Sequence, residues 1–137
     1  MNEDINVKII VSEDISSQNN GPNVSNVIVN PVLVLRAPFI PTALSLAVTI
    51  LTSGIQGNQD HTMNIEIVNV QSGELIYTSN KTNFSIPSHS DNFTFSVDLK
   101  NLPFMNEGRY EVRFTLDEEI YNDSFTVVAN KVFGVNL

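Results

Sequence analysis

Two histidines carry the most versatile chemistry in this chain, and each lies beside an aspartate. His61 follows Asp60, and the segment "SHSD" places His89 between two serines with Asp91 after them. A serine, a histidine and an aspartate within hydrogen-bond reach would form a nucleophilic triad. No serine, however, occupies a Gly-X-Ser-X-Gly elbow that would expose it to a base. The sequence therefore predicts that both histidines lie on solvated loops and that the protein has no catalytic residues.

Four acids near the C-terminal end could supply the oxygen ligands of a calcium ion. They are Asp117, Glu118, Glu119 and Asp123, and calcium accepts about six to eight such ligands. The segment lacks both an Asp-X-Asp-X-Asp-Gly loop and a glycine that would turn the backbone inward. Cysteine is absent, and two histidines are too few for most zinc sites. We therefore expect a charged hairpin tip that keeps a sheet soluble, with no metal ion and no cofactor.

The charge balance limits the classes of partner. Fifteen acids and seven bases give a net charge of −8, which repels nucleic-acid phosphates and anionic lipids. We expect no direct binding to nucleic acid or to membranes. Between positions 107 and 123, six acids accompany only two arginines, which leaves an excess of four negative charges. The six acids are Glu107, Glu111, Asp117, Glu118, Glu119 and Asp123.

These six acids support one hypothesis about function, in which the segment docks on a basic protein surface. A positively charged channel that normally holds nucleic acid would attract the acids and would be blocked by them. The protein would then inhibit a nucleic-acid-processing enzyme of a host, such as a defence nuclease. The alternative is that the charges serve only solubility.

The segment "RAPFIP" gives a second candidate for partner binding. Pro38 and Pro41 hold Phe39 and Ile40 in an extended conformation, and rigid proline-rich segments present side chains at low entropic cost. The alternative is that both side chains plug the open end of a folded domain.

Strict alternation of apolar and polar residues indicates the elements that would position these residues. It occurs at 44–50, 63–67, 93–99 and 110–116, and at 5–11 with Ile10 as an exception, and a period of two is typical of β-strands. After 110–116, the segment "DEE" is expected to turn the chain back into a last strand at 120–128. At 44–50 the second face consists of small residues, as in a strand packed on both sides. No segment shows a helical period. About seven or eight strands at this spacing predict an all-β, antiparallel β-sandwich.

The N-terminal third predicts less regular structure. The segment "SEDISSQNNGPNVSN" from 12 to 26 is rich in turn-forming residues and predicts a loop. The apolar run that follows contains Pro31, which lacks the backbone donor that a central strand needs. An edge strand that bends and crosses between sheets would fit. We expect a single domain of residues 1–137, in which 1–36 add an edge strand and a loop to a sandwich core at 41–128.

The segment "NLPFMNEGRYEV" indicates the kind of sandwich. Gly108 can adopt the positive φ that a corner requires, and Tyr110 can bury its ring while its hydroxyl reaches the backbone. This arrangement resembles the tyrosine corner of immunoglobulin-like domains, although the paired cysteines and the tryptophan of antibody domains are absent. In addition, "LRAPFIPTALSLAVTI" and "NLPFMNEGRYEVRF" are similar to segments of small bacterial and phage-borne proteins of unassigned function. No catalytic residues carry over from that group.

Two classes of function follow from the sequence. The first is a non-enzymatic, protein-binding accessory module of a bacterium, phage or mobile element, in its narrower form the acidic inhibitor. The alternative is a structural component of a virion or cell-surface assembly, which would form a homo-oligomer. The acidic first residues do not read as a secretion signal, and the longest apolar stretch, 43–51, is too short for a membrane helix. We expect a cytoplasmic protein.

Overall fold

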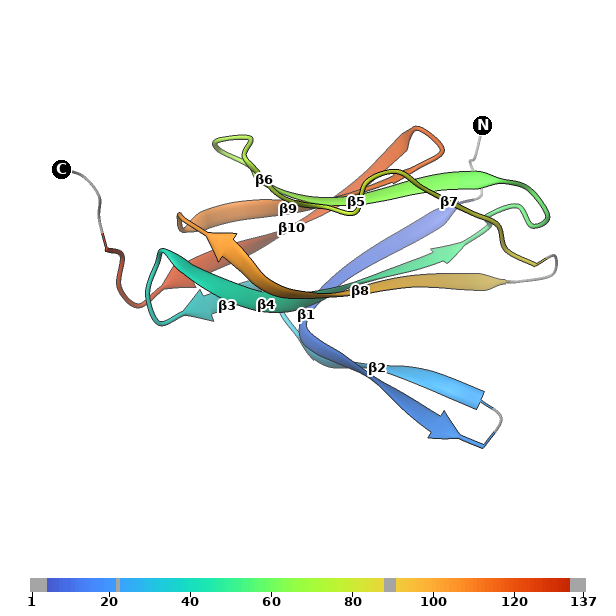
Figure 1. Ribbon diagram of the computed structural model, residues 1–137, viewed down its shortest axis with the longest axis horizontal. Coiled ribbons are helices and arrows are strands. Elements are labelled where there is room, and N and C mark those ends of the chain that lie inside the picture. The colour runs from blue at the N-terminus through green and yellow to red at the C-terminus, as the bar shows by residue number, and fades with distance from the viewer. Residues whose placement is uncertain (1–4, 22, 88–90, 134–137) are drawn as a thin grey trace.

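The computed structural model describes residues 5–21, 23–87 and 91–133, which form ten β-strands and no helix. The strands build two sheets that face each other as the layers of a sandwich (Figure 1). The predicted all-β, mostly antiparallel, immunoglobulin-like sandwich is confirmed. The strands outnumber the predicted seven or eight because short strands occur at 34–37, 75–78 and 82–84 and because the expected loop after residue 11 is itself paired.

The first sheet has four antiparallel strands in the order β2-β1-β4-β8. These are β2 (Asn23–Pro31), β1 (Asn6–Asn20), β4 (Thr42–Ser53) and β8 (Asn92–Phe104). Strand β4 lies between β1 and β8, and at 46–50 both of its faces are buried, as the sequence predicts. Leu46, Val48 and Ile50 lie in the core, while Ala47 and Thr49 are covered on the opposite face.

The second sheet follows the order β3-β10-β9-β5-β6, with β7 paired to β5 beside this path. Its strands are β3 (Val34–Ala37), β10 (Glu119–Ala129), β9 (Gly108–Leu116), β5 (His61–Asn69), β6 (Leu75–Thr78) and β7 (Thr82–Phe84). Among the described strands, β3 and β10 are the one parallel pair, and an isolated parallel bridge joins Ile40 to Val132. The chain leaves the first sheet after β2 and joins the second at β3, which confirms the predicted crossing between sheets.

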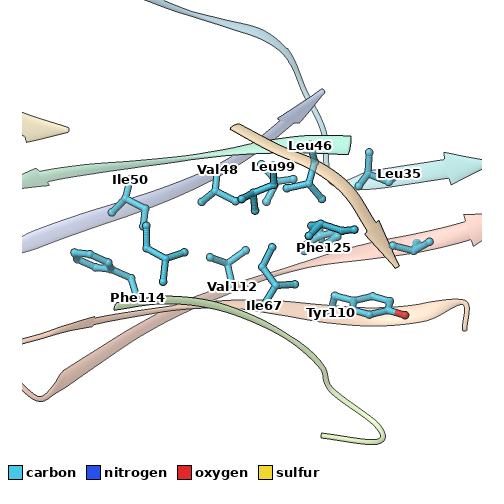
Figure 2. Close-up of a cluster of buried hydrophobic side chains, with 14 of the residues drawn as sticks. Leu35, Leu46, Val48, Ile50, Ile67, Leu99, Tyr110, Val112, Phe114 and Phe125 are labelled. Carbon is cyan, nitrogen blue, oxygen red and sulfur yellow. The ribbon is translucent and has the colours of Figure 1, made fainter. Parts of the chain in front are cut away.

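The core fills the space between the sheets with side chains from alternate positions of each strand. Figure 2 shows Val48 and Ile50 of β4 facing Val112 and Phe114 of β9 across this space. All four side chains are at most 1% exposed. Since burial of one large aliphatic or aromatic side chain stabilises a fold by about 1.5 to 3 kcal/mol, the alternation read from the sequence accounts for the association of the two sheets.

The tyrosine corner forms as expected at the start of β9. The hydroxyl of Tyr110 donates a hydrogen bond of 2.7 Å to the carbonyl oxygen of Asn106, and Tyr110 is 1% exposed. Gly108 has a φ of 132°, a backbone conformation that residues with a Cβ rarely adopt. The corner therefore fixes the direction in which β9 enters its sheet.

The predicted loop after residue 11 is wrong, because residues 12–31 form a hairpin that we call the arm. Its two halves pair in antiparallel register from Ser12 opposite Pro31 onward, including Ile15 opposite Ile28. Figure 1 shows the arm leaving the sandwich as an isolated two-stranded ribbon. The polar composition of this segment predicts a loop, because neither face of the hairpin is apolar enough to produce a clear alternation.

Candidate interaction surfaces

His61 is not on a solvated loop as predicted, because it begins β5 and is 7% exposed. Its Nδ1 lies 2.5 Å from Oδ2 of Asp117, and its Nε2 lies 2.7 Å from the carbonyl oxygen of Gln56. A carbonyl oxygen and an ionised carboxylate only accept hydrogen bonds. Both ring nitrogens must therefore donate, and the geometry favours a charged imidazolium. His89 lies outside the described residues.

The environment shifts the pKa values of both members of this pair. Burial by itself would lower the pKa of His61, but the hydrogen bonds to Gln56 and Asp117 and the carboxylates of Asp117 and Asp60 raise it above the ordinary value of 6.5. Burial would also raise the pKa of Asp117, but hydrogen bonds from His61 and from the backbone N–H of Thr62, together with the charge of His61, hold it below its ordinary 3.8. Each charge thus favours the other.

The pair lies at a tight turn, which explains its place in the fold. Asp117 and Glu118 connect β9 to β10 with φ values of 48° and 81°, and a type I′ hairpin turn requires positive φ at both central residues. Oδ1 of Asp117 accepts the N–H of Thr62 at 2.8 Å, and the N–H of Asp117 reaches the carbonyl of Thr62 at 3.0 Å. The predicted turn at "DEE" is confirmed. The carboxylate of Asp117 joins this turn to the start of β5. Because both His61 nitrogens are occupied, the ring has no position left for activating a serine.

The six acids between 107 and 123 do not form one free acidic surface. Glu107 precedes β9 and accepts the N–H of Ala129 at 2.7 Å, while Glu111 accepts a hydrogen bond of 2.7 Å from Nε of Arg113. Asp117, at the far end of β9, is neutralised by His61. Glu118, Glu119 and Asp123 are exposed. Within the described residues no group of acids and histidines could hold a metal ion.

The two residues of "RAPFIP" lie in different environments. Ile40 is fully buried, and its backbone N–H and C=O bond to Lys131 and Phe133 at 2.9 and 2.8 Å. Its assignment as a partner-binding residue is therefore wrong, because the side chain fills the core. Phe39 is 43% exposed and contacts the ring of Phe133 edge-on at 5.8 Å. Only Phe39 remains accessible to a partner.

A hollow that the sequence did not predict lies where the two sheets part. We call it the edge groove; it has a volume of about 180 Å³ and is lined by residues of β1, of the crossing segment and of β10. The lining includes Ile9, Val11, Val32, Leu33, Asp123 and Ser124. Asp123 lies directly opposite the buried Val112 in the β9–β10 pair, so it occupies a core-facing position of its strand. A charge at that position was the one signal in the sequence that could have indicated the groove.

The strand that borders the edge groove has an open edge. The N–H of Thr126 bonds to the carbonyl of Leu33 at 2.9 Å, and β3 pairs with β10 from Thr126 onward. Successive residues of a strand direct their backbone groups to opposite edges, so the groups of Ser124, Asn122 and Ile120 lie on the same edge as that of Thr126. Among the described residues, no strand pairs with this edge before Thr126.

Strand order and the tyrosine corner define the class of this protein, an immunoglobulin-like β-sandwich. Its sequence matches a family model over residues 8–127, and the chain belongs to that family, a family of unknown function designated DUF6941. This confirms the expected relation to proteins of unassigned function. No curated protein matches the sequence significantly.

Solved structures match the chain at low identity. A β-glucosidase from Listeria innocua in complex with glucose matches 94% of this chain with a TM-score of 0.51 and 10% identity, and the chain spans only 17% of its length. The CARDB domain of a Pyrococcus furiosus protein, solved in complex with di-metal ions, matches 90% of this chain and 96% of its own length with a TM-score of 0.42 and 12% identity. At such identities the likeness concerns the fold alone. The described residues contain no helix long and apolar enough to cross a membrane.

Proposed function

We propose that this protein is a non-enzymatic, protein-binding accessory module. The observation that carries the proposal is the edge groove, an apolar hollow beside a strand edge with open backbone groups. Sheet edges of this kind are templates for pairing with another chain, and soluble proteins usually cover or charge them. Recognition modules use them to bind extended segments by strand addition.

Exposed apolar side chains in the groove and on the open edge add to this support. Leu33, which lines it, is 80% exposed, and Ile120 on the open edge is 62% exposed. Single exposed apolar residues are common on protein surfaces, but Leu33 lines a hollow and Ile120 lies on an edge that pairs with no described strand before Thr126. A partner that covered them would remove apolar surface from water as well as complete the sheet.

The test is capture and reconstitution. The purified protein would be immobilised beside an unrelated β-sandwich of similar net charge, and both would be exposed to lysate of the native host. A protein retained only by this chain would then be purified and titrated against it by calorimetry. A saturable stoichiometric complex supports the proposal, and the absence of any specifically retained protein contradicts it.

The narrower form of the proposal has a nucleic-acid-processing enzyme as the partner, which the protein would inhibit. The net charge of −8 supports it, because a basic channel attracts an acidic protein in a salt-dependent way. Glu118 and Glu119 are exposed acids at the β9–β10 turn, where they could enter such a channel. Reversing both charges should abolish inhibition of the captured enzyme, and full inhibition by the reversed variant would contradict this form.

A second candidate, a structural component of a virion or cell-surface assembly, is supported by the arm. Apart from Glu13 and Asp14 at its base, the arm carries no charged side chain, and an isolated two-stranded hairpin is only marginally stable in water. A ribbon with so few charges, whose outer edges pair with no other described strand beyond Ser12, is suited to pairing with a second copy. Light scattering separates the candidates, because this one requires stable self-association. Both candidates keep the expectation of a bacterial or phage-borne protein, and the accessory module keeps the expectation of action in the cytoplasm.

A further inference from the structure

The edge groove combines three features that together describe what would fill it. Its floor is apolar and includes Ile9, Val11 and Val32. One side is the open edge of β10, whose backbone groups at Asn122 and Ile120 have no strand partner among the described residues. At its rim stands the exposed carboxylate of Asp123.

The open edge has the length of a short strand, and β3 occupies the same edge of β10 beyond it. Strand β3 pairs with the C-terminal part of β10 from Thr126 to Ala129. The chain reaches β3 from the first sheet through Val32 and Leu33. A segment added along residues 120–124 would therefore lie in line with β3 and meet Leu33 at its end. It would complete the outer row of the sheet and cover the groove.

Asp123 has its charge available for such a segment. Its Oδ1 accepts the N–H of Ser124 at 2.9 Å. This contact uses one carboxylate oxygen and leaves Oδ2 to accept a hydrogen bond from a ligand. No ion pair joins Asp123 to a basic side chain in the part of the chain that the structure describes. Arg109, on the neighbouring strand, donates instead to Oγ of Ser124 at 3.2 Å. The carboxylate therefore lacks a cationic partner at the mouth of an apolar hollow.

We propose that the edge groove binds an extended, basic peptide segment of a partner protein, which pairs with β10 through Asn122 and Ile120 and places a lysine or arginine against Asp123. This inference rests on the protein-binding function proposed above and names its site and ligand class. The ligand residue opposite Asp123 faces the groove. The methylenes of a lysine or arginine would cover Val32 and Ile9 while the charged group reaches the carboxylate. Residues two positions away on the segment share this face and would be apolar.

Charge complementarity favours this ligand over a second copy of the chain. The whole molecule carries a charge of −8, so two copies meeting at this edge would place Asp123 against an acidic surface. A basic segment experiences the opposite field and approaches faster at low salt.

The test uses a displayed library of random peptides about ten residues long, enough to form one strand. The library would be selected on the full chain and counter-selected on the Asp123→Lys variant. The expected result is enrichment of sequences with alternating apolar residues and a lysine or arginine at a fixed position. Failure to enrich any sequence that prefers the wild type, or enrichment of acidic sequences, overturns the proposal.

Synthetic copies of the enriched peptides would then be titrated against matched variants. Asp123→Lys and Asn122→Pro should each weaken binding by about tenfold or more, because the first reverses the charge and the second removes the backbone donor. Asn122→Ala keeps that donor, and Asp98→Lys makes the same charge change on β8 in the other sheet, so both should bind as the wild type does. Equal affinity for Asp123→Lys and the wild type overturns the proposal.

A second measurement covers the case in which Asn122→Pro does not fold. Saturating peptide should slow hydrogen exchange at the amides of Asn122 and Ile120 in the wild-type protein, and unchanged exchange there overturns the proposal. A dimer that Asn122→Pro converts to a monomer would identify a second copy as the occupant and would also overturn it. If a captured natural partner binds Asp123→Lys as tightly as the wild type, the binding function stands and only this site is refuted.

Discussion

Nδ1 of His61 lies 2.5 Å from Oδ2 of Asp117, so the first residue of β5 is joined to the turn that follows β9. The two residues are 56 positions apart. The contact secures a turn whose residues both have positive φ, a conformation that is uncommon for residues other than glycine. A charge pair thus holds one end of the second sheet together.

This pair predicts how stability depends on pH. The pKa of His61 is raised above 6.5, so its contribution is complete below that pH and is lost as the pH rises through the higher folded-state value. The pKa of Asp117 is lowered below 3.8, so its contribution is complete above that pH and is lost as the pH falls through the lower folded-state value. The pair therefore stabilises the fold most between about pH 3.8 and 6.5.

The matched variant for this prediction is Asp117→Asn, because asparagine tolerates positive φ and its side-chain oxygen can still accept the N–H of Thr62. Histidine resonances followed by NMR should show the pKa of His61 falling in the variant. Urea unfolding should show that the variant loses less stability than the wild type as the pH rises from about 5 to about 9. Identical titration of His61 in both proteins would refute the assignment.

The tyrosine corner gives a second prediction. Tyr110→Phe removes the hydroxyl that bonds to the carbonyl of Asn106 but keeps the buried ring, so we expect a loss of about 1 kcal/mol in the free energy of unfolding. Tyr77→Phe is the control, since Tyr77 is only half-buried. Denaturant unfolding of both variants makes the comparison. Equal effects would show that the corner hydrogen bond contributes nothing specific.

The segment "RAPFIP" provides the third prediction. Ile40→Ala removes a fully buried side chain and should cost about 2 to 5 kcal/mol. Phe39→Ala removes a side chain that is 43% exposed and makes one edge-on aromatic contact, so a cost of about 1 kcal/mol is expected. Thermal or denaturant unfolding distinguishes the two. A loss for Phe39→Ala as large as that for Ile40→Ala would place Phe39 in the core as well.

The sequence predicted the strands that have one apolar and one polar face. It did not predict features that depend on contacts between distant segments. Residues 110–116 alternate so clearly that Tyr110, Val112, Phe114 and Leu116 could be placed in the core from sequence alone, and the structure buries all four. Their alternation is a local property that survives without knowledge of the partner strand.

The misses have long-range causes. The burial of His61 depends on Asp117, a partner that strand pairing brings close and that no local pattern reveals. Six acids close together in the sequence were read as one surface, but β9 carries Glu107 and Asp117 to its opposite ends. The edge groove arises from Ile9, Val32 and Asp123 on three separate segments. Such sites follow from topology, which local alternation leaves undetermined.

The arm supplies the last prediction. Among the side chains that the structure describes, none from residues 13–30 belongs to the buried core, and Ser12 and Pro31 are register partners across the base of the hairpin. Replacing residues 13–30 by an Asn-Gly turn, which suits a two-residue hairpin connection, should therefore leave the free energy of unfolding within about 1 kcal/mol, since only surface structure and loop length change. Unfolding in urea tests the stability. Sedimentation velocity tests the role of the arm. An oligomer that becomes a monomer on removal of the arm assigns self-association to it. An unchanged number of subunits, with the edge groove still binding its peptide, would show that the arm is not the means of assembly.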